Sequence, residues 1–323
     1  MTGQTEPEHS SRNDDWQREV VNRLAFAALN EQRRARRWNI FFKVVLLAYL
    51  FLIFFALYLP REGGKPLTVG KHTALVEVKG VIAADAEASA DNIVSGLRAA
   101  FDDENTVGVI LRINSPGGSP VQAGYVYDEI RRLRKKHPDV RLYAVVADMC
   151  ASGGYYIAAA ADEIYADKAS IVGSIGVLMN GFGFVDAMKK LGVERRLYTA
   201  GEHKGMLDPF SPEKPDEVAH VKSMLAAIHR QFIDAVKTGR GERLADDPTI
   251  FSGLFWTGEE AKKLGLVDGL GSASYVAREI IGEEKIVDYT PRPDYLERFA
   301  ERFGMAMAET LARITGAESA RLR

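Results

Sequence analysis

The longest apolar run in the chain is Trp38–Leu59, WNIFFKVVLLAYLFLIFFALYL. Its core, Val44 to Leu59, carries no charge, and the whole run approaches the roughly 20 residues that cross a bilayer. Lys43 stands near the start, where its side chain can reach back to the lipid headgroups. A buried core helix is the alternative, but such a helix normally shows a polar stripe. The pattern predicts one transmembrane helix.

The charges that flank this run predict its orientation. Four arginines lie within residues 33–37, before the run, whereas Arg61, Glu62 and Lys65 follow it. Because the more positive flank stays in the cytoplasm, the bulk of the chain is expected on the far side, in the periplasm of a bacterium. A cleaved signal peptide is the alternative, but LYLPREGG offers no small-x-small cleavage site. We therefore expect a retained, single-pass inner-membrane anchor with a cytoplasmic N-terminus.

Beyond the anchor, segments of strand and helix character alternate. The near-continuous apolar run Val107–Ile113 is typical of a strand buried on both faces, and the alternation predicts a parallel-rich α/β domain. The expected strands are Ala74–Val78, Val107–Ile113, Leu142–Ala147, Ile164–Ala166, Ile171–Met179 and Arg196–Thr199, and the expected helices are Asp91–Phe101, Val121–Lys135, Tyr155–Ala161 and Asp216–Lys237.

The remaining segments complete the expected organisation. Residues 1–37 form a cytoplasmic tail with one weakly amphipathic helix at Trp16–Leu29, 38–59 the anchor, and 60–71 a Gly/Pro/Lys linker. The main domain covers 72–289. Residues 290–323 carry an amphipathic helix at Asp294–Ile314, which docks on its own core or on another subunit.

The charge and the cysteine content limit the binding partners and covalent links that are expected. The formal net charge of −2 gives no reason to expect a nucleic-acid partner. The single cysteine, Cys150, excludes an intrachain disulfide. It is expected to point into the core as a small hydrophobic residue, although its thiol is an alternative nucleophile. We expect neither a metal nor a cofactor.

Two glycine-containing blocks follow predicted strands. In RINSPGG, Gly117 and Gly118 leave backbone N–H groups free to face a substrate, as a developing oxyanion requires, although a plain tight turn is the alternative. In ASGGYY, small neighbours expose the hydroxyl of Ser152 at a helix N-terminus, and the N–H of Gly153 is a further donor. A simple helix cap would also explain Ser152. Both blocks follow strands, where α/β folds place their sites.

A serine nucleophile needs a base, and His203 and Lys204 in GEHKG are the main candidates, with Lys168 as an alternative in a surface turn. A lysine must be neutral to accept a proton, although the reference pKa of a lysine is about 10.4. Burial can lower such a pKa by about 3–5 units. The other five histidines are expected in the tail, in the linker, after a basic run and on the long helix, at His9, His72, His137, His220 and His229.

Four blocks, RINSPGGS, ASGGYYIA, VGSIGV and HKGMLDPF, together resemble the short-form signal peptide peptidase A family of serine–lysine peptidases, over roughly His72 to Ile286. The resemblance implies that Ser152 is the nucleophile, Lys204 the general base and Ser174 the residue that orients the lysine. It also implicates Gly117 and Gly118 on the oxyanion side. The implied fold is the ClpP/crotonase type, a repeated ββα superhelix.

The resemblance also implies a function. The chain is expected to be a membrane-anchored serine endopeptidase that forms an acyl-enzyme, degrades signal peptides and other membrane-associated peptides at the bilayer, and assembles as a homo-oligomer with sites at protomer interfaces. A Ser/Lys protease that clips stomatin would differ only in substrate. A crotonase-type acyl-CoA enzyme would need no membrane span. A ClpP-like Ser-His-Asp peptidase would need a histidine shortly after the nucleophile, and none lies between Ser152 and His203. A silent membrane scaffold would need none of these side chains.

Overall fold

The computed structural model describes residues 31–34, 36–54 and 70–291. The described part of the chain holds one helix, Glu31–Phe54, that is long and apolar enough to cross a membrane, and none of it is buried. This helix overlaps the predicted span Trp38–Leu59. The last residues of that span, most of the linker and the amphipathic helices expected at Trp16–Leu29 and Asp294–Ile314 lie outside the described residues.

Residues 70–291 belong to a separate compact unit built on one eight-stranded sheet with the strand order β6-β5-β3-β2-β1-β8. Off this path, β4 pairs with β3, and β7 pairs with β4. Strands β1 (His72–Lys79) and β2 (Thr106–Ser115) pair in parallel along their length. All other pairings are parallel except β5 with β6. The predicted parallel α/β architecture is therefore confirmed.

Strand β3 (Arg141–Ala151) pairs with two different strands along one edge. Its first part pairs with β4 (Glu163–Ala166), and its last part pairs with β5 (Ile171–Gly173). Because β4 pairs only with the first part of β3, the last residues of β3 are free to pair with β5. This branching brings the residues that follow β3 and β5 next to each other.

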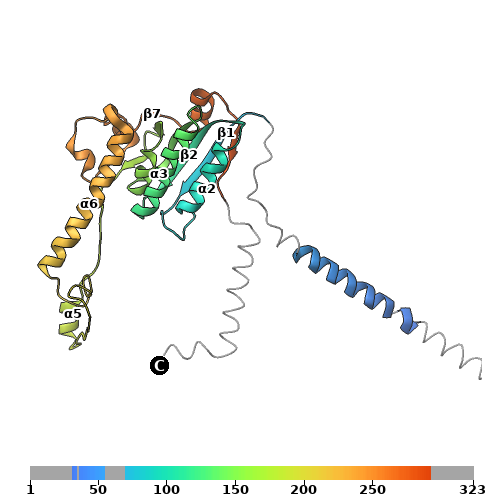
Figure 1. Ribbon diagram of the computed structural model, residues 1–323, viewed down its shortest axis with the longest axis horizontal. Helices are drawn as coiled ribbons and strands as arrows, with labels where there is room; N and C mark the ends of the chain where they lie inside the picture. Colours follow the sequence, from blue (N-terminus) through green and yellow to red (C-terminus); the bar gives the residue numbers. More distant parts are fainter. Residues whose placement is uncertain (1–30, 35, 55–69, 292–323) are drawn as a thin grey trace, which may run out of the picture. The chain divides into compact units, whose positions relative to one another are not determined.

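Helices cover the main face of the sheet (Figure 1). Helices α2 (Ala90–Phe101) and α3 (Pro120–Lys136) are N-capped by Ser89 and Ser119, and α3 also has a proline in its first turn. Alternate strand residues point into the core beneath these helices, whereas the residues between them face a smaller cluster around Val276. Each face of the sheet therefore has its own apolar cluster.

Helix α6 (Pro215–Arg240) is anchored to the sheet only at its C-terminal half. Phe232, Ala235 and Val236 are buried in the core, whereas the first half of α6 projects away from the sheet toward α5 (Val185–Lys190), which has no buried residue (Figure 1). We call residues 177–214, between β5 and α6, the arm. The remaining elements are α4 (Gly153–Ala158), η1 (Gly241–Arg243), η2 (Pro248–Phe251), β6 (Phe255–Thr257), α7 (Gly258–Lys263), β7 (Gly269–Leu270), α8 (Ala273–Tyr275), η3 (Val276–Ile281) and β8 (Ile286–Asp288).

One strand prediction is wrong and another is too long, and the errors fall on the arm or just before it. The segment Ile171–Met179 is a strand only as far as Gly173, and Arg196–Thr199 forms no strand. Val172 and Ile175 are buried in the core, but the apolar residues beyond them are exposed: Leu178 is 78% exposed and Tyr198 89% exposed. The apolar pattern here marks an exposed surface, so the periodicity that identifies core strands does not apply.

Candidate active site

Ser152 occupies a strained turn between β3 and α4. Its φ and ψ are 52° and −121°, which a non-glycine residue rarely adopts. The turn is held from both sides, because the Ser152 N–H donates to Gly173 O at 2.9 Å and the Tyr156 N–H donates to Ser152 O at 3.0 Å. A serine on a sharp strand-to-helix turn presents its hydroxyl above the sheet, as nucleophilic serines do. Backbone strain of this kind is concentrated at functional sites.

Gly117 lies directly against this turn. Its φ is 99°, and a Cβ at this position would lie 2.7 Å from both Ser152 Cβ and Gly153 N. Any larger residue would therefore displace Ser152. The Gly117 N–H donates to Ser115 Oγ at 3.1 Å. Gly117 thus allows the close approach of two loops, while its own N–H is already engaged.

The N–H groups of Gly118 and Gly153 lie on the two sides of this approach. A Cβ on Gly153 would lie 3.3 Å from Gly118 N. Among the described residues, no hydrogen bond uses either of these N–H groups as donor. Gly153 begins α4, so its N–H is one of those that a helix leaves unpaired. Of the three glycines expected from the sequence, Gly118 and Gly153 therefore offer free donors for an oxyanion.

Ser174 directly follows the strand that neighbours the end of β3. Ala151 pairs with Gly173 in the β3–β5 ladder, so the two serines follow directly on adjacent parallel strands. Ser174 also has a positive φ, 53°, and its N–H donates to Leu254 O at 2.7 Å. The structure thus brings together the expected nucleophile and the serine expected to orient the base.

A cavity of about 660 Å³ connects these groups. Ser152, Ser174, Gly118 and Gly153 line it together. Its apolar wall comes from the start of the arm, from Tyr156 and from α6, through Val177, Leu178, Met179, Met224, Leu225, Ile228 and Phe232. An extended peptide with apolar side chains is the kind of ligand that such a wall accommodates.

Sequence reasoning missed the part of α6 that lines this cavity. The helix was expected, but its contribution to the site was not. The pattern that reveals it is the spacing of Met224, Ile228 and Phe232, which places three apolar side chains on one face. The segment Ser252–Gly253, which also lines the cavity, carries no comparable pattern.

Lys204 is not brought to Ser152 within one chain. Lys204 is exposed on the arm, next to His203, whose ring contacts Glu217 in the first turn of α6. The part of α6 that packs on α4, the helix that follows Ser152, includes Phe232, whose ring centroid lies 5.0 Å from that of Tyr156. Fifteen helical residues separate Glu217 from Phe232, a distance of roughly 22 Å along the axis. Lys204 is also absent from the residues that line the Ser152 cavity, so no contact between Lys204 and Ser152 is observed within the described chain.

The alternative reactive residues lie in other surroundings. Cys150 is fully buried, and burial raises the pKa of its thiol, as expected for an unreactive core residue. Lys168 is exposed in the turn Asp167–Ser170. The expectation for His72 is wrong: it opens β1, is fully buried, and its Nε2 lies 2.8 Å from the Tyr289 hydroxyl. Its burial follows from pairing of β1 between β2 and β8.

Comparison with known proteins shows a match to one peptidase family over part of the chain. Residues 134–286 match the sequence profile of peptidase family S49, a range that includes Ser152, Ser174 and Lys204 and begins after Gly117 and Gly118. This match, together with the SppA and protease 4 relatives, supports the resemblance carried by the four sequence blocks, and the mostly parallel sheet confirms the α/β fold class that it implies.

This chain covers less than two thirds of the length of several curated relatives that it matches, and the share differs between them. A putative signal peptide peptidase SppA from Enterococcus faecium is 28% identical over 228 residues, which are 68% of this chain and 66% of that protein. A Brucella abortus protein named Na(+)/H(+) antiporter NhaA is 48% identical over 210 residues, 65% of this chain but only 28% of that protein. A solved mutant of the 1510-N membrane-bound stomatin-specific protease aligns with a TM-score of 0.38 and 17% identity, covering 63% of this chain and 81% of that chain.

Proposed function

We propose that this chain, which carries a domain of peptidase family S49, is a membrane-anchored serine endopeptidase with Ser152 as nucleophile and Lys204 as general base. The observation that carries the proposal is the strained turn at Ser152, which lines one cavity together with Ser174 and the glycines that offer free N–H donors. A helix cap alone would need neither the strain nor the unpaired donors.

The proposed reaction is acyl transfer. Neutral Lys204 removes the proton of the Ser152 hydroxyl as its oxygen attacks a peptide carbonyl. The oxyanion that forms accepts hydrogen bonds from the N–H groups of Gly118 and Gly153. The lysine then protonates the leaving amine, and a water molecule deprotonated by the same amine releases the acyl group. The Ser174 side chain orients the lysine amine toward the Ser152 hydroxyl.

We further propose that Lys204 acts on the Ser152 of a neighbouring protomer. The separation of the two residues within one chain supports this arrangement, as does the arm itself. The arm exposes large apolar side chains that would stay in contact with water in a monomer, among them Leu178, Phe182, Leu191 and Tyr198. An arm of this kind that packs on the next copy would generate a ring through a head-to-tail interface.

Subunit mixing tests this arrangement. Ser152→Ala and Lys204→Ala are each expected to abolish hydrolysis, and the double variant to be no worse than either. Co-assembled from equal amounts of the two single variants, a ring with sites shared between neighbours regains about a quarter of wild-type activity. Mixed oligomers that remain inactive would place both residues in one chain, and activity in Lys204→Ala alone would remove the dyad.

The substrate and location are proposed from the anchor. The helix Glu31–Phe54, with its arginine-rich start, supports an inner-membrane protein whose peptidase domain faces the periplasm. Tethering the site at the bilayer raises its effective concentration toward peptides left in the membrane, such as cleaved signal peptides. An alkaline phosphatase reporter fused after Lys71 is therefore expected to be active, and one fused before Arg33 inactive. The opposite result would reverse the topology and remove this substrate class.

A further inference from the structure

The loop that carries Lys204 is built from short local turns. The Lys204 N–H donates to Gly201 O at 3.2 Å, and the Met206 N–H donates to His203 O at 3.0 Å. Each of these bonds spans only three residues, so none of them ties the loop to the rest of the domain. A base that is displaced by about 1 Å loses up to roughly 100-fold in rate, so contacts that fix this loop matter for catalysis.

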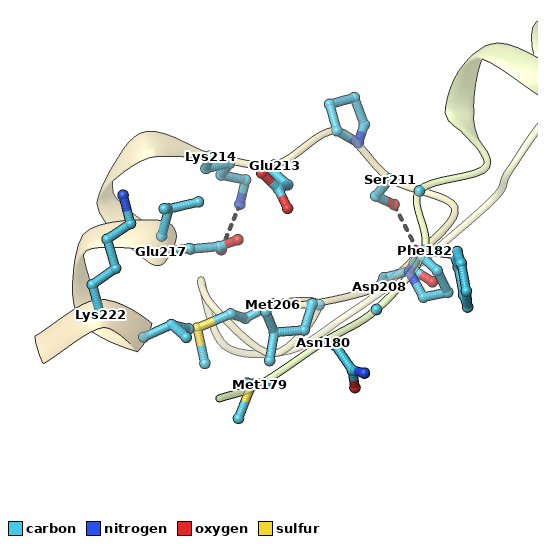
Figure 2. Close-up of a pocket in the computed structure, with 18 of the residues that line it drawn as sticks. Met179, Asn180, Phe182, Met206, Asp208, Ser211, Glu213, Lys214, Glu217 and Lys222 are labelled. Carbon is cyan, nitrogen blue, oxygen red and sulfur yellow. Dashed lines mark hydrogen bonds and ion pairs between the residues drawn. The ribbon is translucent and has the colours of Figure 1, made fainter. Parts of the chain in front are cut away.

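Glu217 provides one such contact, immediately beside the lysine. His203 Nδ1 lies 3.2 Å from Glu217 Oε1, and the same oxygen accepts a hydrogen bond from Lys214 Nζ at 3.1 Å (Figure 2 shows the Lys214 contact). Glu217 is only 8% exposed although it is charged. Asp216 also faces the imidazole, with its Oδ2 at 3.9 Å from His203 Nδ1. The Glu217 carboxylate therefore joins the loop to the first turn of α6.

The surroundings keep this carboxylate charged. The Lys214 hydrogen bond is the largest influence that lowers the pKa of Glu217, and the His203 hydrogen bond lowers it further, against the opposing effect of burial. The N-terminal turn of a helix also favours a negative charge. Glu217 is thus a permanent acceptor for the imidazole N–H at the pH where a lysine base works.

A second set of contacts fixes the other end of the loop, but to the arm alone. Asp208 pairs with Arg195 at 3.2 Å and accepts the Ser211 hydroxyl hydrogen bond at 2.7 Å. Phe210 stacks on Phe184 at 5.5 Å between ring centroids. Among the described hydrogen bonds, the one between His203 and Glu217 directly connects the residues next to Lys204 with α6. Helix α6 in turn is anchored in the core of the domain through Phe232, Ala235 and Val236.

We propose that His203 and Glu217 form a latch that positions the Lys204 loop on α6, which makes both of them positioning residues for the lysine base. This inference rests on the proposed function, because it requires Lys204 to be the base. His203 is adjacent to Lys204 in the chain, so fixing its ring restricts the Lys204 backbone. The latch accounts for a histidine beside the catalytic lysine without giving it a proton-transfer role.

Kinetics of latch variants in the full-length, detergent-extracted protein test the inference. His203→Ala and Glu217→Ala are expected to lower kcat by roughly 10-fold to 100-fold with KM nearly unchanged, because the base is misplaced and the cavity is intact. The double variant is expected to be no worse than either single variant, because both remove the same contact. Lys214→Ala, the matched control, removes the other partner of Glu217 and is expected to change kcat less than about 3-fold.

Conservative variants separate positioning from folding. His203→Asn places an amide N–H where Nδ1 stands, and Glu217→Gln keeps an acceptor oxygen, so each is expected to recover most of the lost kcat. Wild-type kcat in both alanine variants, with Lys204→Ala inactive, would overturn the latch and leave the dyad intact. An active Lys204→Ala would instead overturn the proposed function. Failure of His203→Asn and Glu217→Gln to exceed the alanine variants, with unchanged oligomeric state, would also contradict the latch.

Discussion

Ser152 and Ser174 follow neighbouring parallel strands and share a positive φ that is unusual for serine, 52° and 53°. The hydrogen bond from Ser152 N to Gly173 O, 2.9 Å, joins the two turns directly. Residues held in such conformations cost about 1–3 kcal/mol each, and the surrounding ladder compensates for this cost. The two serines are therefore fixed relative to each other by the sheet, whatever the state of the arm.

The strain at Ser152 predicts that two variants lacking the nucleophile differ in stability. Ser152→Gly and Ser152→Ala both remove the nucleophile, but only glycine tolerates the observed backbone without strain. After the entropic cost of glycine, Ser152→Gly is expected to be about 1 kcal/mol more stable than Ser152→Ala. Thermal unfolding of both inactive variants in detergent measures the difference. A glycine variant that unfolds at a lower temperature would show that the turn is not strained.

The anchoring of α6 predicts a large loss of unfolding free energy when Arg240 is removed and a small loss when Arg243 is removed. Arg240 is almost fully buried and forms two hydrogen bonds with Asp268, at 2.7 and 2.9 Å. Burial alone would raise the pKa of Asp268, but the Arg240 hydrogen bonds and charge outweigh it, so the pKa lies below its ordinary value. Arg240→Ala removes the buried partner of the Asp268 carboxylate, which keeps only the more exposed Arg243 as a charged partner, and is expected to cost about 3 kcal/mol of unfolding free energy.

Arg243 is the matched control for this pair. It contacts the same carboxylate at 3.2 Å, but its side chain is 40% exposed. Arg243→Ala is expected to cost at most about 1 kcal/mol. Equal losses in chemical denaturation of the two variants would contradict the assignment of Arg240 as the residue that anchors α6.

The contact between α2 and α3 predicts a specific acid dependence. Hydrogen bonds from Arg132 and Arg98 lower the pKa of Glu129 from 4.5 to about 2. Because the folded pKa is depressed, this group stabilises the fold above pH 4.5, and its contribution disappears as the pH falls from 4.5 to about 2. Glu129→Gln is therefore expected to be less stable at neutral pH, with the gap to wild type closing across this window.

The measurement is the unfolding temperature of wild type and Glu129→Gln between pH 2 and 7. Glu279→Gln, which removes an exposed ion pair with Arg278, serves as control and is expected to change little at any pH. A gap between wild type and Glu129→Gln that stays constant with pH would show that the arginines do not hold the carboxylate in its charged form.

The sequence predicts the sheet and its helices well because their residues face a core. Val107–Ile113 and Leu142–Ala147 are almost entirely apolar, and the strands found there are β2 and β3, which start one residue earlier and end two and four residues later. The arm is different. Its apolar residues mark an exposed surface, so Arg196–Thr199 has the composition of a strand without a neighbouring strand to pair with.

The candidate site divides in the same way. Blocks that follow directly on strands, such as the turn at Ser152 and the glycine loop at Gly118, could be placed from sequence because parallel strands end at one edge of the sheet. The wall from α6 and the position of Lys204 could not. Both depend on how a helix crosses the sheet and on contacts beyond one chain, which local pattern does not contain.

The most direct measurement of the central account is the site and rate of acylation. The protein is mixed rapidly with an activated ester of an apolar peptide, quenched in acid, digested and analysed by mass spectrometry. The account predicts one acyl group on Ser152, formed at least about 1,000-fold more slowly in Lys204→Ala and absent in Ser152→Ala. An acyl group on Cys150 or Ser174, or an unchanged rate of acylation in Lys204→Ala, would contradict it.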